Sequence, residues 1–100
     1  MNISAQEVEA AIVTHPDVAE AAVVAMPDRE LGEKVCVFVI PRDGVVPTLA
    51  AVRAHLLERG FARFKLPERL EIRAALPRTA SGKVQKAPLR AELASGVPQP

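Results

Sequence analysis

Polar and apolar positions alternate with a helical period at the start of the chain. Ser4 and Glu7 form a capping box, and apolar residues then repeat every three or four positions. This spacing predicts a first helix over residues 4–14, which ends at His15-Pro16 because proline cannot continue it.

Two apolar runs with strand character come next. Residues 21–26 and 33–40 are separated by a turn signal that includes Pro27-Asp28 and Gly32. The second run is apolar on both faces, as expected of a central strand. Its side chains are Val35, Val37 and Val39 on one face, and Cys36, Phe38 and Ile40 on the other.

The second half of the chain predicts a helix, a strand and a last helix. Thr48 is a helix N-cap and Gly60 a helix stop, and residues 68–74 then alternate. Pro88 fits the first turn of the last helix. The strand alternation places Leu70, Ile72 and Ala74 inward and Arg69, Glu71 and Arg73 outward.

The predicted order is helix, strand, strand, helix, strand, helix. It indicates a small α+β domain over residues 1–94, with a sheet of about three strands covered by helices. Residues 95–100 show no pattern and are expected to be a disordered tail.

Composition excludes several classes of protein. Of the 100 residues 49% are apolar, which allows a modest core, but no apolar run approaches the roughly 18 residues of a membrane span. No signal peptide is evident, so the expected location is the cytoplasm. Cys36 is expected to be a buried hydrophobe rather than a nucleophile, and His15 and His55 lack neighbours at metal-ligand spacing, so no metal site is predicted.

Charge is distributed unevenly along the chain. Residues 1–58 carry four Lys and Arg against nine Asp and Glu, whereas residues 59–100 carry nine against three. This bias favours an anionic partner, with phosphate as the leading candidate, although a solvated basic face is an equal alternative. The basic side chains concerned are Arg63, Lys65, Arg69, Arg73, Arg78, Lys83 and Lys86.

Lys83 lies in the segment Leu-Pro-Arg-Thr-Ala-Ser-Gly-Lys-Val-Gln-Lys, residues 76–86. Thr79 and Ser81 can bond to nearby backbone, and Gly82 allows dihedrals closed to other residues, so this lysine is expected on a mobile loop tip. The Ser-Gly-Lys triplet lacks the upstream glycine of a phosphate-binding P-loop.

The whole pattern resembles the C-terminal domain of the adenylate-forming superfamily, which includes acyl- and aryl-CoA ligases, peptide-synthetase adenylation domains and luciferases. The resemblance covers nearly the full length through five ordered segments. They are Asn2-Ile3-Ser4-Ala5-Gln6-Glu7-Val8-Glu9; His15-Pro16-Asp17-Val18 with Ala21–Val24; Pro27-Asp28 with Gly32-Glu33; Lys65-Leu66-Pro67; and Leu76-Pro77-Arg78-Thr79 with Ser81-Gly82-Lys83.

The resemblance implies an ATP-dependent, AMP-forming ligase. In that reaction a carboxylate attacks the α-phosphate of ATP, and a thiol of CoA or phosphopantetheine then displaces AMP. Lys83 matches the catalytic lysine of the first step, supported by Thr79, Ser81 and Gly82. ATP with Mg²⁺ and the thiol cofactor are thus implied for the full-length enzyme, with no tight binding by this fragment alone.

The chain is expected to depart from the family pattern by lacking the large N-terminal adenylation domain, which is therefore the implied partner. The chain alone is expected to be an inactive, mobile lid. The resemblance implies that the domain rotates so that a second face, near Asn2, Gly32 and Glu33, helps to form the thiol channel. For Gly32 a simple turn role is the alternative.

Three functions follow as hypotheses. The first is the C-terminal domain of an acyl-CoA ligase for a fatty or aryl acid. The second is the same domain of an aryl-acid-AMP ligase that loads a carrier protein, favoured by Phe64-Lys65-Leu66-Pro67 and Gln85-Lys86. The third is a stand-alone basic module for nucleic acid or an acidic protein, which the scarcity of aromatic residues disfavours.

Overall fold

Helices and strands follow one another in the predicted order. The computed structural model of the protein describes residues 5–28 and 32–94, so the predicted cap Ser4 and tail 95–100 lie outside the described residues. The elements are α1 (Ala5–Ile12), β1 (Val18–Asp28), β2 (Gly32–Pro41), α2 (Leu49–Glu58), the 3₁₀ helix η1 (Arg63–Lys65), β3 (Arg69–Ile72) and α3 (Lys86–Ala94).

The three strands form one sheet in the order β1-β2-β3, which confirms the prediction that β2 is central. β1 pairs with β2 antiparallel, with Val23 opposite Val37, and β3 pairs with β2 parallel, with Val37 opposite Leu70. β1 extends beyond the predicted residues 21–26 at both ends. The extension includes Pro27, which has no N–H to donate. A proline is tolerated there because β1 is an edge strand.

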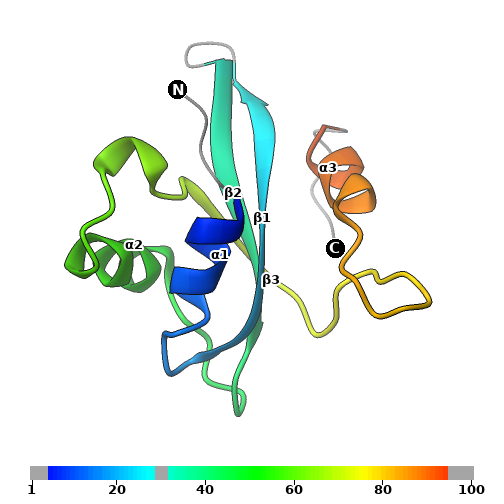
Figure 1. The fold of residues 1–100 in the computed structure, drawn as a ribbon, viewed down its shortest axis with the longest axis horizontal. Helices are drawn as coiled ribbons and strands as arrows, with labels where there is room; N and C mark the ends of the chain where they lie inside the picture. Colours follow the sequence, from blue (N-terminus) through cyan, green and yellow to red (C-terminus); the bar gives the residue numbers. More distant parts are fainter. Residues whose placement is uncertain (1–4, 29–31, 95–100) are drawn as a thin grey trace.

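Helices cover both faces of the sheet. Figure 1 shows α1 and α2 on one face and α3 on the opposite face. The alternation of β2 supplies both layers, because Val37 faces α1 and α2 while Phe38 faces α3. The predicted α+β architecture is therefore confirmed.

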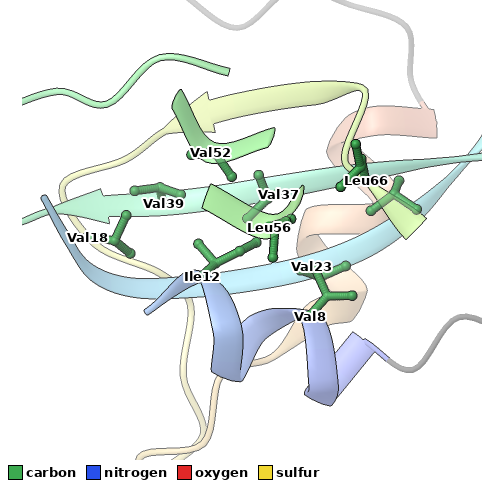
Figure 2. Close-up of a cluster of buried hydrophobic side chains, with 10 residues drawn as sticks. Val8, Ile12, Val18, Val23, Val37, Val39, Val52, Leu56 and Leu66 are labelled. Carbon is green, nitrogen blue, oxygen red and sulfur yellow. The ribbon is translucent and has the colours of Figure 1, made fainter. Parts of the chain in front are cut away.

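The larger core cluster lies between the sheet and the helices α1 and α2. Its side chains converge from β1, β2 and both helices, with Leu66 closing one end (Figure 2). Ile12 and Leu56 are completely buried, which accounts for the apolar spacing of their helices. The labelled members in Figure 2 are Val8, Ile12, Val18, Val23, Val37, Val39, Val52, Leu56 and Leu66.

The second cluster lies between the sheet and α3. Phe38 is its largest fully buried side chain, and Leu89 and Leu93 pack on it from α3. Leu76, which precedes the Lys83 loop, is buried in the same cluster. One end of that loop is therefore fixed to the core.

Local signals set both ends of α2 as predicted. Thr48 Oγ1 accepts a hydrogen bond of 3.1 Å from the Ala51 N–H at the N-terminus. At the C-terminus Gly60 has a φ of +85°, and the Phe61 N–H donates to the Leu56 carbonyl at 3.1 Å. This pattern is a Schellman motif, which needs the left-handed conformation that glycine adopts without strain.

The third strand is shorter than predicted. β3 ends at Ile72, and Ala74, expected to point inward, is exposed because the chain leaves the sheet there to carry Leu76 to the α3 face. Glu71 and Arg73, expected to point outward to solvent, are instead half-buried. Arg73 lies over the Phe38 ring, 5.2 Å from its centroid, and pairs with Glu92 of α3 at 2.7 Å.

Cys36 is completely buried on the α3 face of β2, as predicted for a small hydrophobe. Burial raises the pKa of its thiol from 9.0 to about 12. We expect native protein to resist thiol reagents at neutral pH and to be labelled only as fast as it unfolds, because the thiolate is the reactive form.

The same burial gives stability a pH dependence. The folded state keeps the Cys36 proton while the unfolded thiol loses it above about pH 9, so the free energy of unfolding should fall as pH rises from there. Urea titrations at pH 7.5 and 9.5, compared with Cys36→Ala, measure this contribution. An identical pH slope in wild type and Cys36→Ala would contradict it.

Among the described residues, no helix is long and apolar enough to cross a membrane.

Candidate functional site

The segment that carries Lys83 folds into a narrow hairpin. Arg78 and Val84 form an antiparallel bridge, and the Thr79 N–H donates to the Lys83 carbonyl at 2.8 Å. One step further out, the Gln85 N–H donates to the Pro77 carbonyl at 2.8 Å. The two sides of the loop therefore hold each other in register over several residues.

The tip of the hairpin is a hydrogen-bonded turn. The Gly82 N–H donates to the Thr79 carbonyl at 2.9 Å, and Gly82 has a φ of +94° that favours glycine. The Thr79 hydroxyl accepts from the Lys83 N–H at 3.2 Å and lies 2.9 Å from the Ser81 hydroxyl. The three predicted supporting residues thus come together around the backbone of Lys83.

The loop has a defined conformation at its tip, because the turn at Gly82 is closed by its own hydrogen bonds. Movement of the loop relative to the rest of the enzyme stays a prediction. A preformed turn presents Lys83 in one orientation, which suits a group that must meet a substrate at a fixed point.

The Lys83 side chain is exposed to solvent. Its ammonium forms no ion pair with any carboxylate within residues 5–28 and 32–94. An unpaired ammonium on a short, ordered turn is available to an anion that approaches from outside the domain.

Most other cations of the basic half are neutralised inside the domain. Of the seven residues predicted to attract an anion, five are ion-paired, so the uneven charge along the sequence does not produce a continuous free basic face. The pairs are Lys65–Glu7, Arg69–Glu71, Arg73–Glu71 and Arg73–Glu92, Arg78–Glu20, and Lys86–Glu9. In the described part of the chain, Arg63 and Lys83 have no such pair.

The pKa of Glu71 reflects its ion pairs with Arg69 and Arg73. Burial alone raises the pKa of this carboxyl, but hydrogen bonds from Arg69 and Arg73 outweigh burial and hold the pKa below its ordinary value. Arg73 is thereby occupied on the α3 face of the sheet and is not offered to a ligand.

Two acidic residues that sequence reasoning did not single out define where the loop sits. Glu20 on β1 pairs with Arg78, and Glu9 on α1 pairs with Lys86 at 2.5 Å. The partners Glu20 and Arg78 are 58 residues apart, and no local pattern joins them. They can be found only when the topology is known.

The second predicted face lies away from Lys83. Gly32 and Glu33 begin β2, opposite Asp28 and Pro27 of β1, at the end of the β1–β2 hairpin. Figure 1 shows that end of the hairpin at the top of the sheet and the yellow-orange loop well apart from it, at the lower right. Asn2 lies outside the described residues, so the face is represented by Gly32 and Glu33 alone.

Within the described ranges no three His, Cys, Asp or Glu side chains are grouped so that they could hold a metal ion.

The fold and the loop match one well-populated group of known proteins. Residues 7–83 match the family model described as the AMP-binding enzyme C-terminal domain. The 2,3-dihydroxybenzoate-AMP ligase of Bacillus subtilis is 49% identical over 88 residues, which are 88% of this chain and 16% of that protein. The 2-hydroxy-7-methoxy-5-methyl-1-naphthoate–CoA ligase of Streptomyces carzinostaticus is 47% identical over 89 residues, which are 89% of this chain and 16% of that protein.

A solved structure agrees. The apo structure of MbtA from Mycobacterium smegmatis superposes with a TM-score of 0.88 at 42% identity, covering 93% of this chain and 18% of that chain. This chain thus spans about a sixth of the length of the curated relatives it matches.

Proposed function

The chain belongs to the AMP-binding enzyme C-terminal domain family, and from this premise we propose that it is the lid of an ATP-dependent, AMP-forming ligase that activates a carboxylic acid. The observation that carries the proposal is Lys83, which is exposed on an ordered turn and has no ion pair among the described residues, in a domain that otherwise neutralises most of its basic half. The identity of the relatives as acid ligases supports the reaction class.

Lys83 would act in the first half-reaction. A carboxylate oxygen attacks the α-phosphorus of ATP, the bond to the bridging oxygen breaks, and pyrophosphate leaves with the electron pair. Both reactants are anionic, so an ammonium placed between them offsets their repulsion and stabilises the charge that develops. Thr79, Ser81 and Gly82 would serve this step by fixing the backbone from which Lys83 extends.

The second half-reaction would use the other end of the domain. A thiol attacks the acyl carbon of the adenylate, and AMP leaves. We propose that the lid rotates between the two steps and that the β1–β2 hairpin, with Gly32 and Glu33, then borders the thiol channel. The separation of the hairpin end from the yellow-orange loop in Figure 1 supports an exchange of faces rather than one site for both steps.

The substrate proposal rests on the relatives. Two of them are named for aromatic acids, a dihydroxybenzoate and a naphthoate, so we propose an aryl acid rather than a fatty acid as the substrate. One of these is named an AMP ligase and the other a CoA ligase, so both CoA and the phosphopantetheine of a carrier protein remain acceptors to test. A reaction supplied with ATP, Mg²⁺ and CoA fits a cytoplasmic enzyme.

The stand-alone basic module is the weaker function. It required a free basic face, and five of the seven cations concerned are paired with carboxylates of the domain itself. Phe64 is 56% exposed and could stack on a base, but one aromatic side chain does not make a stacking platform.

A binding experiment tests the proposal on the 100-residue chain. A lid supplies the Lys83 ammonium, whereas adenine, ribose and triphosphate contacts belong to the partner domain. Calorimetric titration with MgATP should therefore show no saturable binding at micromolar concentrations. The enzyme that contains both this domain and its adenylation domain is the positive control. A micromolar dissociation constant for the chain alone would mean that it holds its own nucleotide site, and the lid function would be wrong.

A further inference from the structure

We infer that Arg78 and Glu20 form a clamp that positions Lys83 for acyl-adenylate formation, an inference that rests on the proposed role of Lys83. Neither residue would touch a substrate. The clamp acts on the backbone next to Lys83 and connects it to the sheet.

The geometry of Arg78 makes it a bridge between two parts of the fold. One guanidinium nitrogen, Nη1, donates to the Gly82 carbonyl at 3.0 Å, and the other, Nη2, donates to Glu20 Oε1. A guanidinium is planar, so its two donor directions are fixed relative to each other. The Gly82 carbonyl, which belongs to the peptide bond joining Gly82 to Lys83, is thereby held in a set direction from Glu20.

Glu20 in turn belongs to the sheet. It lies in β1, where it pairs with Ile40 of the central strand β2. The clamp therefore ties the tip of the loop to the sheet, although the loop leaves the core near Leu76. A chain of two hydrogen-bonded contacts runs from the sheet through Glu20 and Arg78 to the Gly82 carbonyl.

A second tie holds the other end of the loop. Lys86, the first residue of α3, pairs with Glu9 Oε2 at 2.5 Å. The same oxygen accepts the Val23 N–H of β1 at 2.6 Å, on the edge of β1 that faces away from β2. The loop is thus fastened to β1 before and after Lys83, and the Lys83 side chain extends from it into solvent.

The clamp is expected to affect the rate of adenylation and not the stability of the fold. The side chains of Arg78 and Glu20 are 35% and 44% exposed, and exposed ion pairs contribute about 0–1 kcal/mol to stability. Loss of the clamp should therefore leave the fold intact. Its effect should appear where small displacements are costly, because a shift of about 1 Å in a reacting group can lower a rate by about 10²-fold.

The test uses the enzyme that contains this domain and its adenylation domain. The variants are Arg78→Met, Glu20→Gln and Arg78→Lys, and the matched control is Arg90→Met, which removes an exposed arginine of α3. The readouts are kcat and KM for acyl-adenylate formation, the rate of thioester formation from supplied acyl-adenylate, and the melting temperature.

We expect the three variants to lower kcat for adenylation by about 10-fold to 100-fold, with KM for ATP, thioester formation and melting temperature unchanged. Arg78→Lys should fail to rescue, because an ammonium keeps the charge but not the planar pair of donors. Arg90→Met should behave as wild type.

A second measurement is independent of turnover. In the 100-residue chain, hydrogen exchange at the amides of Thr79 and Gly82 should accelerate in Arg78→Met and Glu20→Gln, while amides of α2 keep wild-type rates. Unchanged exchange at both tip amides would overturn the clamp.

The remaining outcomes separate this inference from the function on which it rests. Wild-type adenylation by Lys83→Ala would overturn the proposed function itself. Loss of adenylation in Lys83→Ala together with wild-type rates in the Arg78 and Glu20 variants would overturn the clamp alone. An equal fall in both half-reactions with a lower melting temperature would mean that Arg78 has a structural role, and the clamp would again be wrong.

Discussion

Replacing Lys83 by alanine is expected to lower the rate of acyl-adenylate formation by about 10²–10³-fold, the usual effect of removing one electrostatic donor from a transition state. Lys83 is exposed and unpaired among the described residues, so its removal costs the domain no internal contact. The loss should therefore appear in chemistry and not in folding. Carboxylate-dependent pyrophosphate release, measured with the enzyme that contains this domain, reports the first half-reaction directly.

The second half-reaction is the internal control for the same variant. When acyl-adenylate is supplied, Lys83→Ala should form thioester at the wild-type rate, because the proposed thiol face lies at the end of the β1–β2 hairpin, apart from the lysine loop. Lys83→Met keeps the length of the side chain and removes its charge, so it should match Lys83→Ala if charge is what matters. Equal damage to both half-reactions would contradict the division of the domain into two faces.

The order of the elements could be predicted because each depends on short-range signals. Thr48 and Gly60 mark the ends of α2 through hydrogen bonds that span at most five residues. The apolar run of residues 35–40 indicates that β2 is central, because a strand buried on both faces carries apolar side chains such as Val37 and Phe38 on each of them. Such signals act within a few residues, so they can be recognised without knowledge of the fold.

The positions of charged groups could not be predicted in the same way. The sequence indicated a basic second half, yet Glu9 and Glu20 of the first half neutralise Lys86 and Arg78 once the chain is folded. Alternation over residues 68–74 predicts that Arg73 points outward, but α3 covers that face and supplies Glu92. Ion pairs of this kind depend on which elements the topology brings together.

The site shows the same division. Lys83, Thr79, Ser81 and Gly82 could be singled out because they lie within five positions of one another in the chain and build one turn. The residues that fix this turn to the sheet could not, since Glu20 reaches Arg78 across 58 positions. The sequence thus predicts Lys83 as the reactive group, and the structure is needed to find the contacts on which its proposed positioning rests.

The largest expected effect on stability is that of Phe38→Ala, at about 3–5 kcal/mol. Phe38 is completely buried in the middle of β2, where it packs against Leu89 and Leu93 of α3. Its removal leaves a cavity between the sheet and α3 and takes the ring away from the Arg73 guanidinium, 5.2 Å from its centroid. For a domain of 100 residues this loss corresponds to a fall in melting temperature of more than about 10 °C.

Phe64→Ala is the matched control, because it makes the same change of side chain at a position that is 56% exposed. Its cost should stay within about 0.5 kcal/mol. Urea unfolding of both variants of the 100-residue chain measures the difference through their midpoints. Since Lys86 begins α3 only three residues after Lys83, a loosened α3 should also raise hydrogen exchange in the loop of Phe38→Ala. Equal midpoints for Phe38→Ala and Phe64→Ala would mean that α3 is not packed on the sheet, and the position of the lysine loop would then have to be set by another contact.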